Sequence, residues 1–200
     1  MRHKTKNQPM LIQKYRKSWV KDFNELSRAI NEVLVNLNVS VEHIGSTSIP
    51  GLAAKPIIDI DIVFGKNVEF DQIKVRLEKI GYYHKGNQGI HNREVFKRNH
   101  AITLDKILDA IVHHLYVCPA DSEELQRHIL FRNYLTSNEA ERIKYQNLKH
   151  KIAEEVNQDQ KKYAQLKEVK AGKFINEIIE KAKISSSKFE KQTQLNYKNG

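Results

Sequence analysis

The 200-residue sequence contains a single cysteine, Cys118, and no long hydrophobic run. One cysteine excludes an intrachain disulfide framework, so a reducing cytoplasm is the simplest location to expect. The longest apolar run is interrupted by Asp59 and Asp61 and is too short to span a bilayer. The basic N-terminal segment also lacks the apolar stretch of a secretory signal. We therefore expect a cytoplasmic protein with no membrane partner.

Three common patterns of catalytic or metal-binding residues are also missing. The histidines have no zinc-ligand spacing, because His113 and His114 are adjacent and would point to opposite faces of a strand. The glycines at positions 86 and 89 are not followed by the Gly-Lys-Ser/Thr of a Walker loop. Nothing around Ser46 resembles the nucleophile elbow of a serine hydrolase. These absences exclude the best-known zinc, P-loop and serine-hydrolase sites.

The charge balance is strongly basic, with a formal net charge of +10. Lysine and arginine are concentrated in residues 1–21, which contain no acidic residue, and the rest of the chain is only mildly basic. We expect residues 1–11 to form a flexible basic arm. Such an arm can bind nucleic acid nonspecifically, although a charged terminus is more often solvated surface. Nucleic acid is thus a possible but not a favoured partner.

Apolar residues at helical spacing predict a first helix over residues 13–37 that packs on a sheet. The same spacing predicts helices over 68–80, from a cap at Asp121 to about 135, from about 138 to 156, and over about 158–183. From Ile184 onward the sequence has no periodicity and little apolar surface. We therefore expect residues 184–200 to form a mobile tail.

Short segments rich in apolar residues predict strands over residues 39–44, 57–64, 82–85, 94–98, 100–104 and 110–117. Because several of these segments follow one another without a helix, they favour a small mixed sheet over a doubly wound parallel one. The predicted fold is α/β (α+β), with helices flanking the sheet. We expect one domain over residues 12–183, with its sheet part up to about 119 and its helical part over 120–183.

Two acidic residues interrupt the predicted strand over 57–64. In a strand, side chains alternate between faces, so Asp59 and Asp61 share one face while the isoleucines share the other. Burying two neighbouring carboxylates is costly unless they are paired, hydrogen-bonded or bound to metal. A divalent cation would satisfy both carboxylates. The alternative is a pair of partly exposed acids that form salt bridges with lysines.

These residues resemble two related groups of proteins. Gly45-Ser46 followed by Asp-x-Asp resembles the nucleotidyltransferase superfold of DNA polymerase beta, and EHIGSTSIPGLAAKPIIDIDI closely resembles the GrpB family. The likeness continues in WVKDF, in HHLYVCPADSEELQRHILFRNYL, and in YQNLKHKIA and YAQLK. It covers roughly residues 12–182.

The resemblance implies a nucleotidyltransferase fold and Mg²⁺- or Mn²⁺-dependent transfer of a nucleoside monophosphate from a nucleoside triphosphate to an unidentified acceptor. Asp59 and Asp61 would hold the metal ion, and Gly45 and Ser46 would contact the phosphates. Two basic residues would steady the anionic substrate. They are Lys55 and Arg132, for which a solvated lysine and a structural ion pair are the alternatives.

The superfold normally supplies a third carboxylate from a later strand, and this sequence departs from that pattern. The strand predicted over 110–117 carries His114 and Tyr116 instead, while Asp105 and Asp109 precede it. His114 could act as a general base, a metal ligand or a phosphate contact, or be a hydrogen-bonded core histidine. The missing acid leaves open a non-catalytic nucleotide- or RNA-binding module.

The remaining positions shared with the family lie in the first motif and in the predicted helical part. The resemblance implies that the helical part closes over the cleft. These residues are His43, Tyr134, Lys149, Tyr163 and Lys167.

Overall fold

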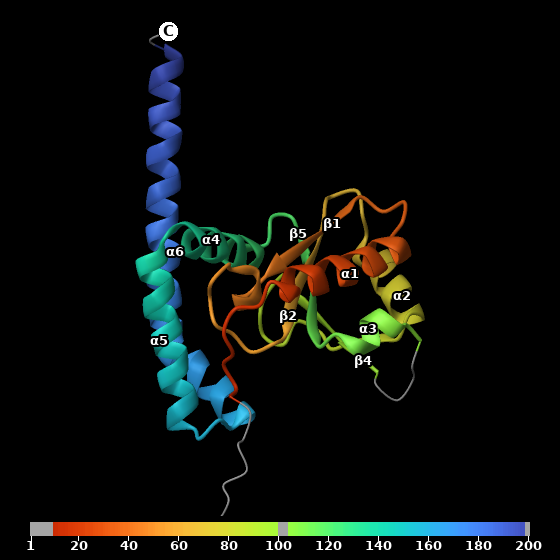
Figure 1. The fold of residues 1–200 in the computed structure, drawn as a ribbon. Helices are drawn as coiled ribbons and strands as arrows, with labels where there is room; N and C mark the ends of the chain where they lie inside the picture. Colours follow the sequence, from red (N-terminus) through yellow and green to blue (C-terminus); the bar gives the residue numbers. More distant parts are fainter. Residues whose placement is uncertain (1–9, 100–103, 199–200) are drawn as a thin grey trace, which may run out of the picture.

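A five-stranded mixed sheet forms the centre of the protein in the computed structural model, which describes residues 10–99 and 104–198 (Figure 1). The strand order is β1-β2-β5-β4-β3, in which β2 and β5 are parallel and the other neighbours are antiparallel. The strands are β1 (Val39–Ile44), β2 (Ile58–Phe64), β3 (Tyr82–His84), β4 (Glu94–Arg98) and β5 (His113–Pro119). The predicted small mixed sheet flanked by helices is confirmed.

The helices fall into two groups. The first group packs on one face of the sheet and comprises α1 (Ser18–Val33), α2 (Phe70–Lys79) and α3 (Lys106–Ala110). The second group follows β5 and stands to one side of the sheet in Figure 1. It comprises α4 (Glu123–Ser137), α5 (Glu139–Glu155) and α6 (Gln160–Lys198). A single 3-10 turn, η1 (Ser46–Ser48), follows β1.

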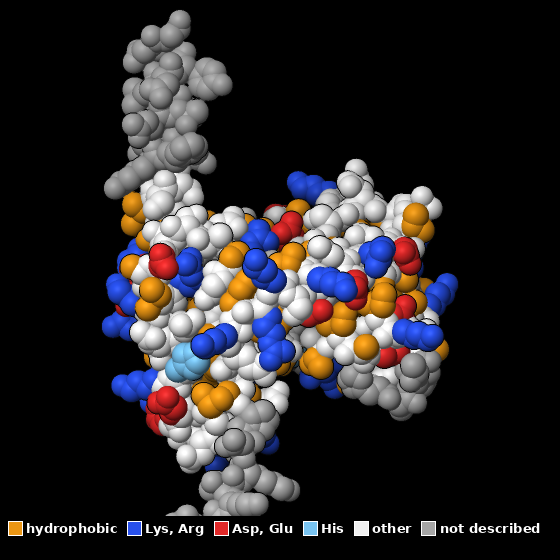
Figure 2. Space-filling model, viewed as in Figure 1, with side chains coloured by type: hydrophobic (Ala, Val, Ile, Leu, Met, Phe, Trp, Pro, Cys, Tyr) orange, Lys and Arg blue, Asp and Glu red, His pale blue; other side chains and the backbone are white. Residues whose placement is uncertain are grey.

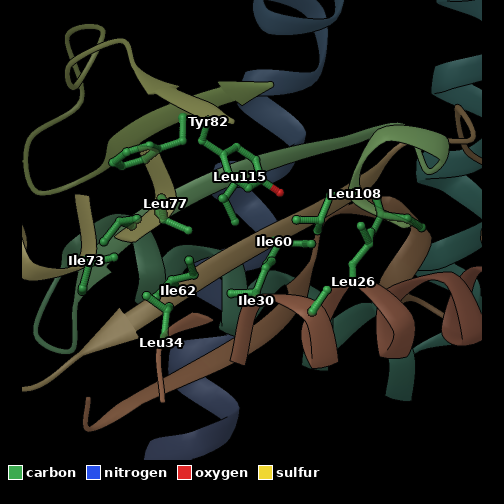
Figure 3. Packing of buried hydrophobic residues seen from close by; sticks show 14 of the residues in the cluster. Leu26, Ile30, Leu34, Ile60, Ile62, Ile73, Leu77, Tyr82, Leu108 and Leu115 are labelled. Atoms are coloured by element: carbon green, nitrogen blue, oxygen red, sulfur yellow. The ribbon is translucent and has the colours of Figure 1, made fainter. Parts of the chain in front are cut away.

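The alternation of side chains along β2 divides the sheet into an apolar and a polar face. Ile58, Ile60 and Ile62 are buried against the first group of helices, and Figure 3 shows Ile60 and Ile62 facing Ile30 of α1. The opposite face carries the two acids. Since paired residues on neighbouring strands point the same way, the register places His114 beside Asp59 on that face.

A second apolar cluster joins the sheet part to the later helices. Ile49 and Leu52, from the segment between η1 and β2, are completely buried among side chains of α4, α5 and α6. Their main partners are Leu135, Tyr145 and Ile178. The segment that carries the first motif is therefore held by the helical part as well as by the sheet.

Several boundaries differ from the sequence-based expectation. Helix α6 continues to Lys198, so most of the segment expected to be a mobile tail over residues 184–200 is helical. Ser122 rather than Asp121 caps α4, because its hydroxyl accepts the Leu125 N–H. The short helix α3, capped by Asp105, was not predicted.

Two predicted segments lie largely outside the described residues. Of the expected arm over residues 1–11, only the last two residues are described, and Leu11 donates its backbone N–H to Gln158. Of the expected strand over 100–104, only Leu104 is described, and it is not in a strand. Among the helices that the structure describes, none has the length and apolar character needed to cross a bilayer.

Replacing Ile30 with alanine should lower the free energy of unfolding by about 2–5 kcal/mol, because Ile30 is completely buried in the main core. Val75→Ala is the matched control, since Val75 is a half-exposed residue of α2, and its effect should stay within about 0.5 kcal/mol. Urea denaturation followed by circular dichroism measures both. Equal effects of the two changes would contradict the assigned core.

Candidate active site

The sharp turn after β1 brings the backbone of Gly45 against Asp59. Gly45 has φ +71° and ψ −169°, a conformation open almost only to glycine. A Cβ atom at this position would overlap Oδ2 of Asp59. The glycine thus serves two purposes: it permits the turn and leaves the space beside one carboxylate oxygen.

His43 fixes the turn from the apolar side of the sheet. Its Nε2 lies 3.0 Å from the hydroxyl of Thr47 in η1, and its ring stacks on Phe23 of α1 at 4.6 Å. Burial lowers the pKa of His43 to about 4 despite the opposing effect of Asp59, so the ring is neutral near pH 7. His43 is therefore a positioning residue for the turn that carries Ser46.

Each of the two carboxylates on β2 pairs with a histidine. Asp59 Oδ1 lies 2.9 Å from Nδ1 of His114, and Asp61 Oδ2 lies 2.8 Å from Nδ1 of His128. Asp61 is completely buried, while the His114 side chain is 49% exposed. The alternative of exposed acids bridged to lysines is wrong, because the partners are histidines and one acid has no solvent contact.

His128 was not predicted from the sequence. It projects from α4, and its Nε2 lies 3.3 Å from Oε1 of Glu124, so the ring bridges two carboxylates. Burial opposes protonation, but the hydrogen bonds that His128 donates to Asp61 and Glu124 outweigh it and raise the pKa of His128 to about 9. A usable signal was its spacing: His128 lies four residues before Arg132 and three after Leu125, a buried residue of α4, so these residues share one helix face.

Three lysines gather on the other side of Asp59. Lys55, Lys149 and Lys167 line a cavity of about 250 Å³, here called the lysine cavity, together with Ser46 and Asp59. His114, Tyr116 and Tyr163 also line it. Lys55 lies just before β2, Lys149 lies in α5 and Lys167 lies in α6, so the helical part supplies two of the three lysines.

Lys149 is the most deeply buried of the three lysines. Its Nζ donates to Ser46 Oγ at 3.2 Å and to the carbonyl of Ala53, and it has no carboxylate partner among the described residues. Burial, reinforced by the charge of Lys167, lowers its pKa well below the usual value. Because Lys149 has no counterion, an anion that enters the cavity would stabilise its charged form.

The other two lysines sit at the opening between sheet and helices. Tyr145 raises the pKa of Lys167, and Asp59 contributes in the same direction. Lys55 lies over the ring of Tyr163 at 5.3 Å, and burial followed by the charge of Lys167 lowers its pKa. All three lysines therefore lie close enough to influence a single bound group.

A second compartment adjoins the lysine cavity. This aromatic cavity has a volume of about 510 Å³ and shares Ser46, Asp59, Tyr116 and Lys167 with the first. Its lining combines apolar side chains with polar and charged ones. The apolar group is Phe131, Tyr145, Ile175 and Ile179, and the polar group includes Glu124, Arg127, His128, Glu168 and Asn176. The two compartments form one cleft, with its floor on the polar face of the sheet and its far wall on the helical part.

Four of the predicted residues line neither compartment: Asp61 and His43, described above, and Arg132 and Tyr134. Arg132 Nη1 is 2.9 Å from Glu42 Oε2 and 2.9 Å from the carbonyl of His43, which is the structural ion pair that the sequence left open. Tyr134 packs against the second apolar cluster.

Strand β5, which lies beside β2, offers no third carboxylate. Asp109 accepts hydrogen bonds from Arg98 and from the backbone of Leu104 and Asp105, and Asp105 itself caps α3. Tyr116 occupies the polar face beside Asp61, and burial raises its pKa. His114 is thus the residue of β5 that contacts Asp59.

Two carboxylate oxygens remain for a metal ion. Asp61 Oδ1 is buried without a hydrogen-bond partner, and Asp59 Oδ2 packs against the backbone of Gly45. Within the described residues no group of three or more His, Cys, Asp or Glu side chains forms a metal cage. Because Mg²⁺ is commonly held by one or two carboxylates together with phosphates and water, the residues fit an ion that is bound with its nucleotide.

The family model named GrpB protein matches residues 9–181. The chain belongs to the GrpB family. It is 31% identical over 179 residues to UPF0157 protein BH1888 of Halalkalibacterium halodurans, covering 90% of this chain and 85% of the relative. It is 27% identical over 171 residues to the Glutamate-rich protein GrpB of Alkalihalophilus pseudofirmus, covering 85% of this chain and 94% of the relative.

A solved structure of a GrpB protein agrees with this assignment. The crystal structure of conserved protein GrpB from Enterococcus faecalis matches with a TM-score of 0.69 and 32% identity, covering 86% of this chain and 96% of that one. A structure of Cid1 in complex with its short product ApU is a weaker match, with a TM-score of 0.48 and 15% identity over 72% of this chain and 43% of that one. The names of the GrpB relatives state no activity.

Gly45→Ala should lower the free energy of unfolding by at least about 2 kcal/mol, since the new Cβ meets Asp59 and the backbone conformation is strained. Gly172→Ala is the control, because Gly172 lies in α6 with open space around it, and the change should stabilise the helix by up to about 1 kcal/mol. Thermal unfolding measures both. A Gly45→Ala protein as stable as the wild type would contradict the close approach.

Proposed function

We propose that this GrpB protein is a Mg²⁺- or Mn²⁺-dependent nucleotidyltransferase that moves a nucleoside monophosphate from a nucleoside triphosphate to an acceptor hydroxyl. The observation that carries this proposal is the position of Asp59, which pairs with His114 and lines the lysine cavity together with it. A carboxylate, a base and a cationic pocket in one place are the groups that nucleotidyl transfer requires.

The cleft accounts for binding of the nucleotide. Lys55, Lys149 and Lys167 supply three cationic groups in about 250 Å³, which suits the charge of a triphosphate. The Ser46 hydroxyl, held by Lys149, adds a further phosphate contact. In the adjoining aromatic cavity, Phe131 and Tyr145 offer ring faces against which a base can pack.

His114 accepts the proton of the acceptor. Because Nδ1 donates to Asp59, Nε2 is left as the basic nitrogen, and Asp59 stabilises the imidazolium that forms. The acceptor oxygen bonds to the α-phosphorus as its proton passes to Nε2. The bond from the α-phosphorus to the bridging oxygen breaks, and pyrophosphate leaves.

Asp59 and Asp61 would hold the divalent ion, which would neutralise phosphate charge, and Asp61 has one buried oxygen without a hydrogen-bond partner. His128 and Glu124 hold Asp61 in place from α4. Since these contacts use only Oδ2 of Asp61, they orient the carboxylate and leave the other oxygen for the ion.

A binding-only role is the second candidate, and one observation favours it. Asp105 and Asp109 are both engaged in holding α3, so no further carboxylate of that segment can support the chemistry. Such a module would bind a nucleotide without transferring it. Recognition of RNA is less favoured, because Figure 2 shows lysine and arginine side chains intermixed with acidic and apolar ones over the displayed face, without a continuous basic stripe.

Asp59→Asn should reduce nucleotidyl transfer by at least about 100-fold, because it removes a metal ligand and the partner of the base. The assay incubates the protein with labelled nucleoside triphosphates, Mg²⁺ or Mn²⁺ and a panel of hydroxyl acceptors, and detects labelled product and pyrophosphate. Asp71→Asn on α2, beyond the opposite face of the sheet, is the control and should be fully active. Unchanged activity in Asp59→Asn would reject the site, and tight nucleotide binding without any turnover would establish the binding-only role.

Binding of a non-hydrolysable triphosphate should be accompanied by proton uptake at Lys149. The free protein disfavours the charged lysine because of burial, and the anion restores that charge, so affinity should fall as the pH rises. Calorimetry in buffers of different ionisation enthalpy measures the uptake. Lys149→Met should remove this component and weaken binding, whereas Lys151→Met, an exposed position on the same helix, should preserve both. Proton uptake that is identical in Lys149→Met would contradict the assignment.

A further inference from the structure

The polar face of the sheet extends beyond the nucleotide cleft, over β4 and β3. The register pairs Val95 with Tyr116 and Tyr83 with Lys97, so these side chains share the face that carries Asp59 and His114. A cavity of about 470 Å³ lies here, and we call it the outer cavity. Its wall comes from strands β3, β4 and β5 and from α3, with Gln160 at the start of α6, rather than from α4 or α5.

The outer cavity and the lysine cavity meet at His114. Both are lined by His114, Tyr116 and Ile57, so the imidazole forms part of the wall between them. His114 is half exposed, and only its Nδ1 is engaged by Asp59. A molecule in the outer cavity therefore has access to the proposed base.

Two cationic groups in the outer cavity lack a full set of partners. Arg93 packs over the ring of Tyr116 at 4.8 Å, its Nε is buried without a hydrogen bond, and its contact with Glu124 is long, at 3.9 Å. Lys97 is exposed and forms no ion pair with any residue that the structure describes. The third cation of this wall, Arg98, is neutralised by Asp109.

This surplus of positive charge identifies the kind of ligand that fits. An anionic group would pair with Lys97 and with the terminal guanidinium nitrogens of Arg93, whose contact with Glu124 is long, and charge-assisted hydrogen bonds of this kind are the strong ones. The volume is that of a small-molecule site. The basic groups are also confined to one cavity, whereas a nucleic-acid strand would require them along a longer path.

We propose that the outer cavity binds the acceptor, and that the acceptor is a small hydroxylated molecule bearing a phosphate or carboxylate group. Lys97 and Arg93 bind the anionic group, which leaves the hydroxyl to be directed at Nε2 of His114. This assignment rests on the proposed nucleotidyl transfer for its reaction, while the anion site itself can be tested without turnover.

The test is calorimetric titration with glycerol 3-phosphate, with glycerol as its uncharged counterpart, in the presence and absence of Mg²⁺ and a non-hydrolysable triphosphate. We expect glycerol 3-phosphate to bind and glycerol not to bind. Lys97→Ala should raise the dissociation constant by about tenfold, through loss of one charged contact. Lys79→Ala, an exposed lysine at the end of α2, is the matched control and should change it by less than about twofold.

Lys55→Ala separates the two cavities. If this change weakens binding of glycerol 3-phosphate and Lys97→Ala does not, the anion occupies the lysine cavity and the acceptor site is overturned. Displacement of the probe by a short RNA, with a steep dependence on salt, would also overturn a small acceptor. Binding that depends on Lys97 in a protein that binds no triphosphate would support the anion site and refute the proposed transfer reaction.

Discussion

Neutralising two carboxylates on one face of a central strand is the constraint on which the rest of this structure depends. Asp59 and Asp61 cannot both stay charged beside each other in a buried place without partners. The protein meets this requirement with two histidines from different elements, His114 on β5 and His128 on α4. The two acids therefore acquire different surroundings, since Asp59 faces the cleft and Asp61 is sealed from solvent.

That requirement also explains why the helical part is inseparable from the site. Helix α4 supplies His128, α5 supplies Lys149 and α6 supplies Lys167, so the far wall provides charge as well as shape. The buried Ile49 and Leu52 hold the motif segment against these helices. Apolar packing and polar contacts therefore both connect the sheet part to the helical part. A displacement of the helices would open the lysine cavity and also break the contact between His128 and Asp61.

The sheet and most of the cleft could be predicted because their signals are local. Alternation along β2 places Asp59 and Asp61 opposite the core, and the glycine at position 45 marks the turn. Family positions also led to Lys149, Tyr163 and Lys167, which all line the lysine cavity. Arg132 shows the limit of such reasoning. The resemblance assigned it to the anionic substrate, but its partner is Glu42, which lies 90 residues away.

The sequence by itself determined the strands, the main helices, the paired acids and the family, because periodicity and motif spacing depend on neighbouring residues. Only the tertiary structure decided that His128 reaches Asp61, that Lys149 is buried on Ser46, and that α6 continues to Lys198. The first two depend on contacts between residues far apart in the chain, whose pairing no local pattern specifies. The same holds for the outer cavity, which exists because strand order places β4 beside β5.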